Sequence, residues 1–398
     1  MKLLFIADGR SPIALNWIEY FIGQGNEVHL VSIYPCEPDL DFASLNVIPV
    51  AFSGAVEQAS AVAGGRGSFL KKIATPGVRT WLRHQFVPRS LPQAASYLQN
   101  LITNLQPDLI HAMRIPYEGM FAALALNMFP APRPPLLVSV WGNDFTLHAP
   151  ATRRLSHLTK LTLQRTAALH TDCQRDLDLA RQLGFSAEKP GVVLPGAGGI
   201  QMDIFYPSPS GRGAGGEGGI IINPRGLRAY VRSDTFFEAV PRVLAHHPGV
   251  QFICPAMQNQ PEAESWASRL GVGDSLSLLP RLSRVKMAEA YRRAQIVLSI
   301  TEHDGTPNTL LEALACGCFP IVGDIPSLRE WIRHGENGFL VDPGDPDSLA
   351  NAIGEALRDP ELRTRAREIN LQLIAERAEY GSGMMRAEQF YRELIGEF

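Results

Sequence analysis

The chain has 398 residues, of which 45% are hydrophobic and 19% charged, with a formal net charge of −3. This composition is typical of a globular protein of two to three domains, and it excludes a disordered chain, a collagen-like chain and a generic nucleic-acid binder. No apolar run approaches the ~20 residues of a membrane-spanning helix, and the apolar start is too short for a signal peptide. The five cysteines are scattered without zinc spacing, so we expect reduced thiols in a cytoplasmic protein.

Short apolar runs alternate with helical patterns in the first half of the chain. The runs are nearly continuous, as in strands that are covered on both faces. We expect strands at 3–7, 27–33, 45–50, 108–112 and 136–140, with helices at 11–25 and 92–106. This alternation predicts an α/β fold with a doubly wound parallel sheet.

The first half also contains a basic stretch. Residues 58–107 include no Asp or Glu, but they do include Arg66, Lys71, Lys72, Arg79, Arg83 and Arg89. Aromatic residues such as Trp81 and Phe86 are interleaved with them. Basic and aromatic segments lie at lipid interfaces, so residues 66–89 are a candidate for peripheral contact with the inner membrane face or an anionic acceptor. A solvated loop packed on the domain would explain the pattern equally well.

The Gly-, Pro- and Ser-rich segment at 206–219 predicts a flexible connection near a domain boundary. Strand patterns then return at 219–223, 250–254, 275–279, 296–300 and 319–323. We therefore expect a first Rossmann-like domain at 1–200, a connection at 201–218, a second domain at 219–380 and a final helix at 381–398 that packs back on the first domain. Parallel sheets bind ligands at the carboxyl ends of their strands, so a cleft between the two domains is the default site.

The segment TEHDGTPNTLLEALACGCFP, at 301–320, follows a predicted strand and opens a helix. Thr306 suits an N-cap and Pro307 the first turn, which would leave the amides of Asn308 and Thr309 available to an anion. Glu312 shares their helical face. A diphosphate and a ribose would fit this arrangement, although a plain capped helix with a solvated Glu312 is the alternative.

Three arginines follow the predicted strand at 219–223, namely Arg225, Arg228 and Arg232. Guanidinium groups match phosphate oxygens bidentately, so these residues are candidates to bind a diphosphate. A basic surface loop is the competing interpretation.

The stretches HDGTPNTLLEALACGCFPIVGD (303–324) and HGENGFLVDPGDPDSLANAI (334–353) resemble the donor-site signature of the retaining glycosyltransferases of family four, which have the GT-B fold. Asp304 and Glu312 stand at the two acidic positions of that signature. Asp304 replaces the usual Glu. The spacing of Arg225 and Arg232 departs from the Arg-Lys pair of the family.

The resemblance implies transfer of a sugar from a nucleotide-diphosphate sugar, with retention at the anomeric carbon. Glu312 would then hold the ribose, Asp304 the sugar hydroxyls, and Arg225 with Arg232 the leaving diphosphate. The resemblance and the helix pattern together assign further donor-site residues, which are Gly305, Thr306, Asn308, Thr309, Arg228, Arg281 and Leu282.

The acceptor side is predicted from strand ends in the first domain. The loop after the first strand, Gly9–Pro12, contributes Gly9 and Ser11, and WGND after the strand at 136–140 contributes Trp141, Asn143 and Asp144. Asp144 could orient an acceptor hydroxyl. His111 is a weaker candidate, because a lone histidine at a strand end is more often structural.

The D-x-D matches at 39–41, 176–178 and 345–347 lie in a loop, on a helix and at a helix start, and none is placed for a divalent cation. We therefore expect a metal-independent enzyme without a cofactor, whose partners are a nucleotide sugar and a glycan, lipid-linked or small-molecule acceptor, and no nucleic acid. Another GT-B enzyme, such as a nucleotide-sugar epimerase, remains an alternative, as does a non-catalytic nucleotide-sugar-binding subunit. The first strand-helix turn at 7–13 lacks G-x-G-x-x-G, which argues against a nicotinamide-dependent oxidoreductase.

Overall fold

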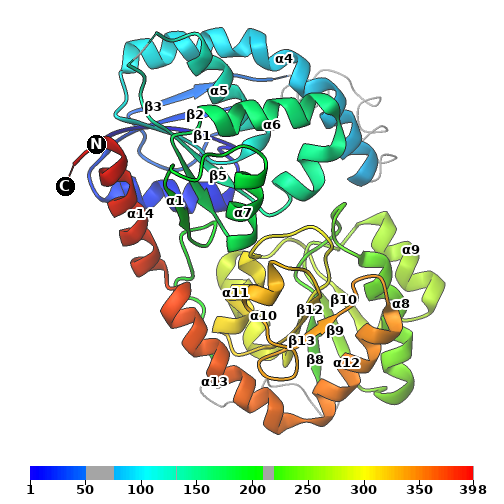
Figure 1. Cartoon of the computed structure of the whole chain (residues 1–398). Helices are drawn as coiled ribbons and strands as arrows, with labels where there is room; N and C mark the ends of the chain where they lie inside the picture. Colours follow the sequence, from blue (N-terminus) through cyan, green and yellow to red (C-terminus); the bar gives the residue numbers. More distant parts are fainter. Residues whose placement is uncertain (51–75, 131, 209–218, 398) are drawn as a thin grey trace. The chain divides into compact units, whose positions relative to one another are not determined.

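The structure is a computed structural model that describes residues 1–50, 76–130, 132–208 and 219–397 (Figure 1). The chain forms two compact units. The first comprises Met1–Gly198 and Ser382–Phe398, and the second comprises Gly199–Gly381.

The first unit is built on a seven-stranded, fully parallel sheet with the order β3-β2-β1-β4-β5-β6-β7. Its central strands are buried along their length because helices cover both faces. The order reverses between β1 and β4. The strands are β1 (Lys2–Ala7), β2 (Glu27–Ser32), β3 (Ser44–Val47), β4 (Leu109–Ala112), β5 (Leu136–Val140), β6 (Ala168–Thr171) and β7 (Gly191–Val193).

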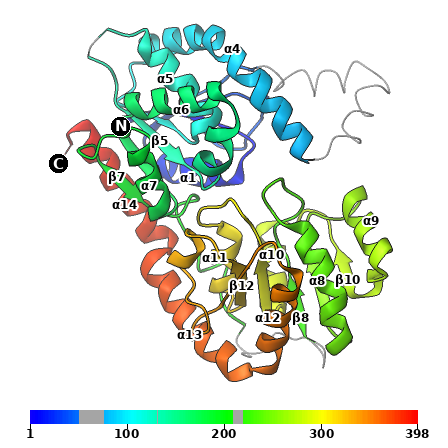
Figure 2. The ribbon, with the colours of Figure 1, turned by 45° about the vertical axis from the view of Figure 1, so that its right-hand side comes forward.

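Helices α4, α5, α6 and α7 contribute to one hydrophobic core, on one face of this sheet (Figure 2). Helix α1 begins with Ser11 as its N-cap, whose hydroxyl accepts from the amide of Ala14 at 3.4 Å, and with Pro12 in the first turn. The helices are α1 (Pro12–Gly23), α4 (Pro76–Leu105), α5 (Met120–Asn127), α6 (Arg153–Arg165) and α7 (Gln174–Gln182).

The basic stretch at 66–89 is described only in part. Residues 66–75 lie outside the described residues, and from Pro76 onward the chain is in α4. Within it His84 and Val87 are buried and Arg89 is exposed. Membrane contact through 66–89 therefore stays a prediction. Among the residues that the structure describes, no helix combines the length and apolarity needed to cross a bilayer.

Helix α14 (Tyr380–Ile395) packs on the first unit from Ser382 onward. The ring of Tyr391 stacks on Phe21 of α1, with ring centroids 4.4 Å apart. The Tyr391 hydroxyl belongs to a buried chain of hydrogen bonds. The two ends of this chain fix the direction of every bond in it, because an indole N–H only donates and a carbonyl only accepts. The chain runs from Trp17 through Tyr391, His111, Ser139 and His170 to the carbonyl oxygen of Leu194.

The second unit has a six-stranded parallel sheet with the order β10-β9-β8-β11-β12-β13, and this order reverses between β8 and β11. Successive side chains of a strand point to opposite faces. Ile221 of β8 accordingly enters one core, and its neighbours Ile220 and Ile222 enter the other. The strands are β8 (Ile220–Ile222), β9 (Gln251–Cys254), β10 (Leu276–Leu278), β11 (Ile296–Ser299), β12 (Phe319–Gly323) and β13 (Phe339–Val341).

The helices of the second unit divide between these two cores. Helices α8, α9 and α12 cover one face, and α10 and α11 cover the other. Helix α13 contributes to both. Their bounds are α8 (Ser233–His246), α9 (Pro261–Leu270), α10 (Arg284–Arg293), α11 (Asn308–Ala315), α12 (Pro346–Arg358) and α13 (Pro360–Arg377).

Two doubly wound parallel sheets in one chain confirm the predicted α/β fold with two Rossmann-like domains. The connection differs from the expected 201–218. Residues 199–208 belong to the second unit, where Ile200 and Phe205 are buried in the core, and 209–218 lie outside the described residues. The chain passes between the units at Gly198–Gly199 and at Gly381–Ser382.

Candidate functional site

The predicted donor-site residues gather where the second sheet reverses its strand order. Arg225 follows β8, and Asp304 follows β11 in the loop that leads to α11. The guanidinium of Arg225 is ion-paired with the carboxylate of Asp304 and donates to the hydroxyl of Thr309 at 3.2 Å. Strand-order reversals in open parallel sheets are the places where such folds bind ligands.

Arg225 is buried, with 6% of its side chain exposed. Burial alone would lower the pKa of this guanidinium, but the Asp304 carboxylate beside it keeps the pKa above its usual value. Its Nε–H is buried and has no partner among the described residues. A buried donor of this kind costs free energy unless something accepts from it, and an anion would do so.

The start of α11 differs from the prediction in one respect. Pro307 is the N-cap, and the helix begins at Asn308. The hydroxyl of Thr306 does not cap the helix and instead accepts from the indole N–H of Trp331 at 2.9 Å. The N-cap is therefore a residue without a capping side chain, and the first amides, those of Asn308 and Thr309, lack a helical partner as expected. The buried Oδ1 of Asn308 has no partner among the described residues.

The loop before α11 is fixed at two points around Asp304. The amide of Gly305 donates to the Asp304 carboxylate at 3.2 Å. The hydroxyl of Ser327 donates to the Asp304 carbonyl at 2.6 Å. Together with Arg225, these contacts hold the carboxylate in one orientation at the start of the helix.

Glu312 lies one turn into α11 and is half-buried. Tyr291 of α10, which is fully buried, donates its hydroxyl to this carboxylate at 3.4 Å. Burial raises the pKa of Glu312 to about 7, against the opposing effects of Arg284 and of the Tyr291 hydrogen bond. The group is therefore poised between its two protonation states near neutral pH.

The other two arginines of the predicted cluster are arranged differently from Arg225. Arg232 forms ion pairs with Asp234 at 2.8 Å and with Glu302 at 2.6 Å, and its hydrogen bonds to these carboxylates raise its pKa. Arg228 is exposed and donates to the hydroxyl of Tyr230 at 3.0 Å. Arg225 is thus the one of the three that contacts Asp304 and Thr309.

The predicted donor-site residues Arg281 and Leu282 follow β10, in the segment where the family resemblance implies contact with the nucleotide base. Arg281 is exposed, and Leu282 is half-buried against the core beside α10. The carbonyl of Pro280 accepts from the amide of Ala256 at 3.2 Å. Contact of this segment with a nucleotide base stays a prediction.

On the predicted acceptor side, Asp144 is completely buried just after β5. Its carboxylate accepts from the Arg114 guanidinium at 3.1 Å and from the amides of Ile115 and Trp141 at 3.2 and 3.1 Å. Burial raises the pKa of Asp144 to about 6, and Arg114 opposes this shift. Asn143 accepts from the same guanidinium at 2.9 Å. Asp144 therefore holds Arg114 and the strand ends together.

Of the remaining acceptor-side residues, two lie in the loop after β1 and one lies in the buried hydrogen-bond chain. Gly9 donates its amide to Ser32 at 3.2 Å, and a Cβ at Gly9 would collide with the sulfur of Cys36. Ser11 caps α1 and also lines a small pocket within the first unit. The placement of His111 is a correction to the sequence prediction. It is 1% exposed and belongs to the buried hydrogen-bond chain of Tyr391, so it is an internal residue rather than an acceptor contact.

With this geometry established, comparison with known proteins decides the family. Residues 212–372 match the model of the glycosyl transferases group 1, and residues 12–196 match that of the glycosyl transferase 4-like domain. The chain belongs to the glycosyl transferases group 1 family. The resemblance predicted from residues 303–353 is thereby confirmed.

Curated relatives of this group 1 family member include a D-inositol 3-phosphate glycosyltransferase of Acidothermus cellulolyticus, 30% identical over 46% of this chain and 44% of the relative. An exopolysaccharide phosphotransferase of Streptomyces coelicolor is 31% identical over 66% of this chain and 26% of the relative. The chain thus spans about half or less of the length of the curated relatives that it matches.

Solved structures show the fold of this family member. Sucrose-phosphate synthase of Thermosynechococcus elongatus aligns over the whole of both chains with a TM-score of 0.76 and 17% identity. HepE of Anabaena, solved in complex with UDP and glucose, aligns over 99% of this chain and all of its own with a TM-score of 0.72 and 15% identity.

One group of three potential metal ligands occurs among the described residues of this family member. It consists of Asp172, Cys173 and Asp176 at the start of α7. Arg175 is ion-paired with Asp176 at 2.7 Å, so a guanidinium already neutralises that carboxylate. The D-x-D pair Asp345 and Asp347 starts α12, where Asp345 accepts from the Asp347 amide as an N-cap.

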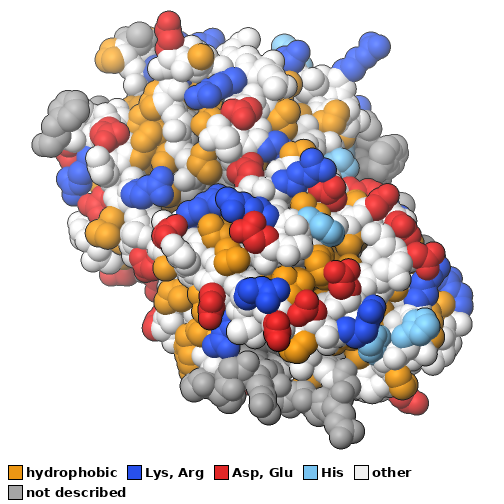
Figure 3. All heavy atoms as spheres, turned by 60° about the horizontal axis from the view of Figure 1, so that its bottom comes forward, with side chains coloured by type: hydrophobic (Ala, Val, Ile, Leu, Met, Phe, Trp, Pro, Cys, Tyr) orange, Lys and Arg blue, Asp and Glu red, His pale blue; other side chains and the backbone are white. Residues whose placement is uncertain are grey.

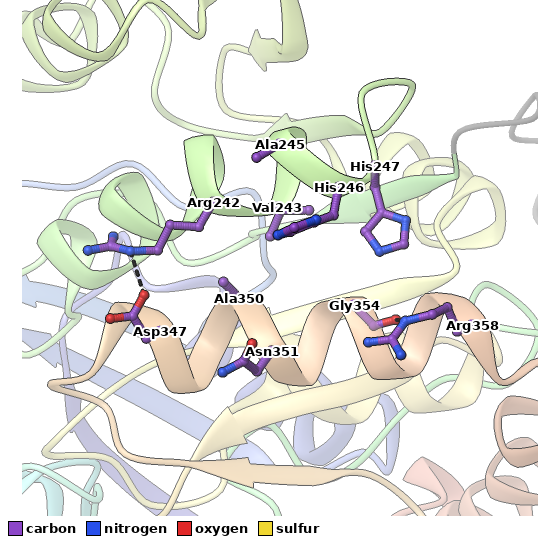
Figure 4. A pocket seen from close by; sticks show the side chains of 10 residues that line it. All are labelled: Arg242, Val243, Ala245, His246, His247, Asp347, Ala350, Asn351, Gly354 and Arg358. Carbon is purple, nitrogen blue, oxygen red and sulfur yellow. Dashed lines mark hydrogen bonds and ion pairs between the residues drawn. The ribbon is translucent and has the colours of Figure 1, made fainter.

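A wide groove of about 680 Å³ runs between α8 and α12 on the surface of the second unit. Figure 4 shows that the two helices run in the same direction, so that His246, His247 and Arg358 gather at their C-terminal ends. Basic side chains at helix C-termini stabilise the helix dipole. Arg242 is ion-paired with Asp347 at 2.7 Å across the groove. These residues are accounted for by helix stability, and the groove lies apart from Arg225 and Asp304.

Charge on the face shown in Figure 3 is mixed rather than segregated. On the face shown in Figure 3, basic and acidic side chains of the described residues are interspersed. Nucleic-acid binding needs a continuous basic surface against the phosphate backbone. The pattern on this face does not favour it.

Proposed function

We propose that the chain transfers a sugar from a UDP-sugar to a hydroxyl group of an acceptor, with retention at the anomeric carbon and without a metal ion. The observation that carries this proposal is the convergence of Arg225, Asp304, Thr309 and Glu312 at the strand-order reversal between β8 and β11. Membership of the glycosyl transferases group 1 family supports it.

The diphosphate is assigned to Arg225 and the start of α11. The buried Nε–H of Arg225 has no acceptor among the described residues. The amides of Asn308 and Thr309 lie in the first turn of α11, where amides have no acceptor within the helix. The helix N-terminus adds a positive partial charge at the same place. When the bond between the anomeric carbon and the phosphate oxygen breaks, the diphosphate takes the electron pair, and these donors stabilise the developing charge.

The sugar hydroxyls are assigned to Asp304 and the ribose hydroxyls to Glu312. Both are carboxylates held in place by neighbours, Asp304 by Arg225 and Gly305, and Glu312 by Tyr291. A carboxylate accepts from two hydroxyls at once, which suits the vicinal diol of a ribose or a pyranose. In the transfer, the acceptor oxygen bonds to the anomeric carbon on the face from which the diphosphate leaves. The proton of the acceptor hydroxyl passes to the departing diphosphate oxygen, so that the products are the glycoside and UDP.

UDP is the proposed nucleotide because HepE, a neighbour that spans this whole chain in fold, is described in complex with UDP and UDP-glucose. Metal independence is proposed because Arg225 and the α11 amides supply positive charge where a cation would otherwise act.

The experiment measures binding and turnover separately. Calorimetric titration with UDP and GDP gives the nucleotide preference, and incubation with UDP-glucose, with a panel of sugar acceptors, gives the release of UDP. Proton NMR of any product reads the anomeric configuration, and an α-linkage from the α-linked donor is expected. Absence of UDP binding at millimolar concentration would contradict the donor assignment. Binding without UDP release would favour a nucleotide-sugar-binding subunit.

A further inference from the structure

A second, smaller pocket lies wholly within the first unit, where β1, β4 and β5 end. Its volume is about 90 Å³, several times the ~10–15 Å³ that one water molecule needs on the same measure. It sits at the strand-order reversal of the first sheet, between β1 and β4. The lining residues are Asp8, Ser11, Ala14, Ile33, Tyr34, Met113, Arg114, Pro116, Tyr117, Glu118 and Trp141.

The pocket contains a buried carboxyl group that the donor chemistry does not use. Glu118 is 4% exposed and accepts from the amide of Tyr117 at 2.7 Å. Burial raises the pKa of Glu118 to about 7, with Arg114 opposing and Asp8 reinforcing the shift. Burying a glutamate without a strong ion pair lowers the stability of the folded protein. The position of Glu118 is therefore better explained by a role in binding than by stability.

The pocket also contains a donor in need of an acceptor. The indole N–H of Trp141 is buried and has no partner among the described residues. Arg114, by contrast, is already engaged, since it donates to Asp144 at 3.1 Å and to Asn143 at 2.9 Å. Asp8 is ion-paired with Arg10 at 3.0 Å. The unmet hydrogen-bonding capacity of this pocket is therefore that of an indole donor and a carboxyl acceptor, which line the same cavity.

A hydroxyl group meets both requirements, because it donates and accepts at the same oxygen. Ala14, Ile33 and Met113 supply apolar wall against which the C–H groups of a ring can pack. A phosphate dianion has no hydrogen to donate to Glu118, and the guanidinium that lines the pocket, that of Arg114, is already engaged by Asp144 and Asn143.

We infer that Glu118 and Trp141 form a subsite for the hydroxyls of an uncharged sugar or cyclitol ring, and that they select such a ring as the acceptor. This inference rests on the proposed function, since it names the acceptor class of that reaction. Glu118 accepts from one ring hydroxyl, and the Trp141 indole donates to the same or the adjacent oxygen. The group selected is neutral, in contrast to the phosphate named in the inositol 3-phosphate relatives.

Ligand-observed NMR with the full chain, in the absence of nucleotide, tests the inference. The probes are D-glucose, D-mannose and myo-inositol, and D-glucose 6-phosphate is the charged counterpart. At least one neutral probe is expected to bind, and the 6-phosphate to bind at least about tenfold more weakly than glucose. Glu118→Gln and Trp141→Phe are each expected to weaken the neutral probe about tenfold, the equivalent of one lost hydrogen bond. Glu19→Gln, on the exposed side of α1, is the matched control and should change nothing.

Three results would overturn the inference: no binding of any neutral probe at 50 mM (roughly the weak limit for so small a site), unchanged binding in both variants, or tighter binding of glucose 6-phosphate than of glucose. Circular dichroism confirms that each variant is folded, and Trp141→Phe gives a second reading if Glu118→Gln is unstable. UDP titration of the same samples keeps the two proposals distinct. If the parent does not bind UDP, the donor assignment is contradicted. If the parent binds UDP but no neutral sugar, only this subsite is contradicted.

Discussion

Arg225 and Asp304 are 79 residues apart in the sequence and form a buried ion pair at the start of α11. The pair joins the loop after β8 to the loop after β11, and so it fixes the two strand ends that border the proposed donor site. Because the guanidinium also reaches Thr309 at 3.2 Å, one side chain organises three of the predicted site residues.

Replacing Arg225 should weaken donor binding more than replacing an exposed arginine does. Arg225→Gln removes the positive charge and leaves the Asp304 carboxylate without its partner. We expect the dissociation constant for UDP to rise about ten- to a hundredfold, since hydrogen bonds to charged groups contribute ~1.5–3 kcal/mol each. Calorimetric titration measures this. Arg365→Gln, on the exposed face of α13, is the control and should leave the affinity unchanged. Equal affinities for the two variants would remove Arg225 from the donor site.

The strands were predictable because buried parallel strands leave continuous apolar runs. Residues 3–7, 27–33 and 136–140 are therefore found almost as expected in β1, β2 and β5. The strand β6 was not predicted, because its sequence ALHT carries two polar residues in four positions. The structure shows why these are tolerated, since His170 is satisfied inside the hydrogen-bond chain that ends on Leu194.

The site residues that lie at the start of one helix could be predicted from their spacing in the sequence. Those that come together only through tertiary packing could not. Asp304, Thr309 and Glu312 follow from the start of one helix. Tyr291 could not be predicted, because it lies on α10 and only the packing of α10 against α11 brings its hydroxyl to Glu312. Glu118 gave no signal either, because a single Glu in IPYEG is expected at the surface, and only the folded chain buries it.

If positive charge from Arg225 and α11 replaces a cation, chelators should not change the reaction. We expect UDP release from UDP-glucose to proceed at the same rate in excess EDTA as in added Mg²⁺ or Mn²⁺. The rate of UDP release under these conditions measures it. If the rate of UDP release falls more than about tenfold in EDTA and Mn²⁺ restores it, a cation takes part in the reaction. A tenfold change in rate corresponds to ~1.4 kcal/mol in the activation free energy.

Removing one hydroxyl from the buried hydrogen-bond chain should destabilise the first unit. In Tyr391→Phe, the indole N–H of Trp17 loses its acceptor and His111 loses its donor, whereas the stacking on Phe21 is kept. We expect the free energy of unfolding to fall by ~1–3 kcal/mol, the cost of a buried polar group left unsatisfied. Urea unfolding at pH 7 measures it.

Tyr97→Phe is the control for that change, because Tyr97 is 65% exposed on α4. Its stability should match the parent within about 0.5 kcal/mol, as is usual for surface substitutions. If Tyr391→Phe is as stable as Tyr97→Phe, the chain of hydrogen bonds does not hold α14 on the first unit.

Glu312 gives a prediction in which protonation and donor binding are linked. Burial raises its pKa to about 7 in the unliganded protein, and ribose hydroxyls donate to its ionised form. Affinity for UDP-glucose should therefore increase as the pH rises from 6 to 8. UDP-glucose is the suitable probe because its diester phosphates do not titrate in this range. Glu312→Gln should weaken binding about ten- to a hundredfold at pH 8 and abolish the pH dependence.

The same pKa fixes the sign of the effect on stability. A carboxyl group whose pKa is raised on folding stabilises the protein when protonated, and this contribution is lost as the pH rises from about 4.5 to about 7. Glu312→Gln lacks the titrating group. Its unfolding free energy, relative to that of the parent, should therefore increase over this pH interval and remain at the higher relative value at pH 8. The exposed Glu355→Gln on α12 should follow the parent at every pH. Parent-like binding of UDP-glucose by Glu312→Gln, together with this gain in stability, would show that Glu312 is buried for packing and does not hold the ribose.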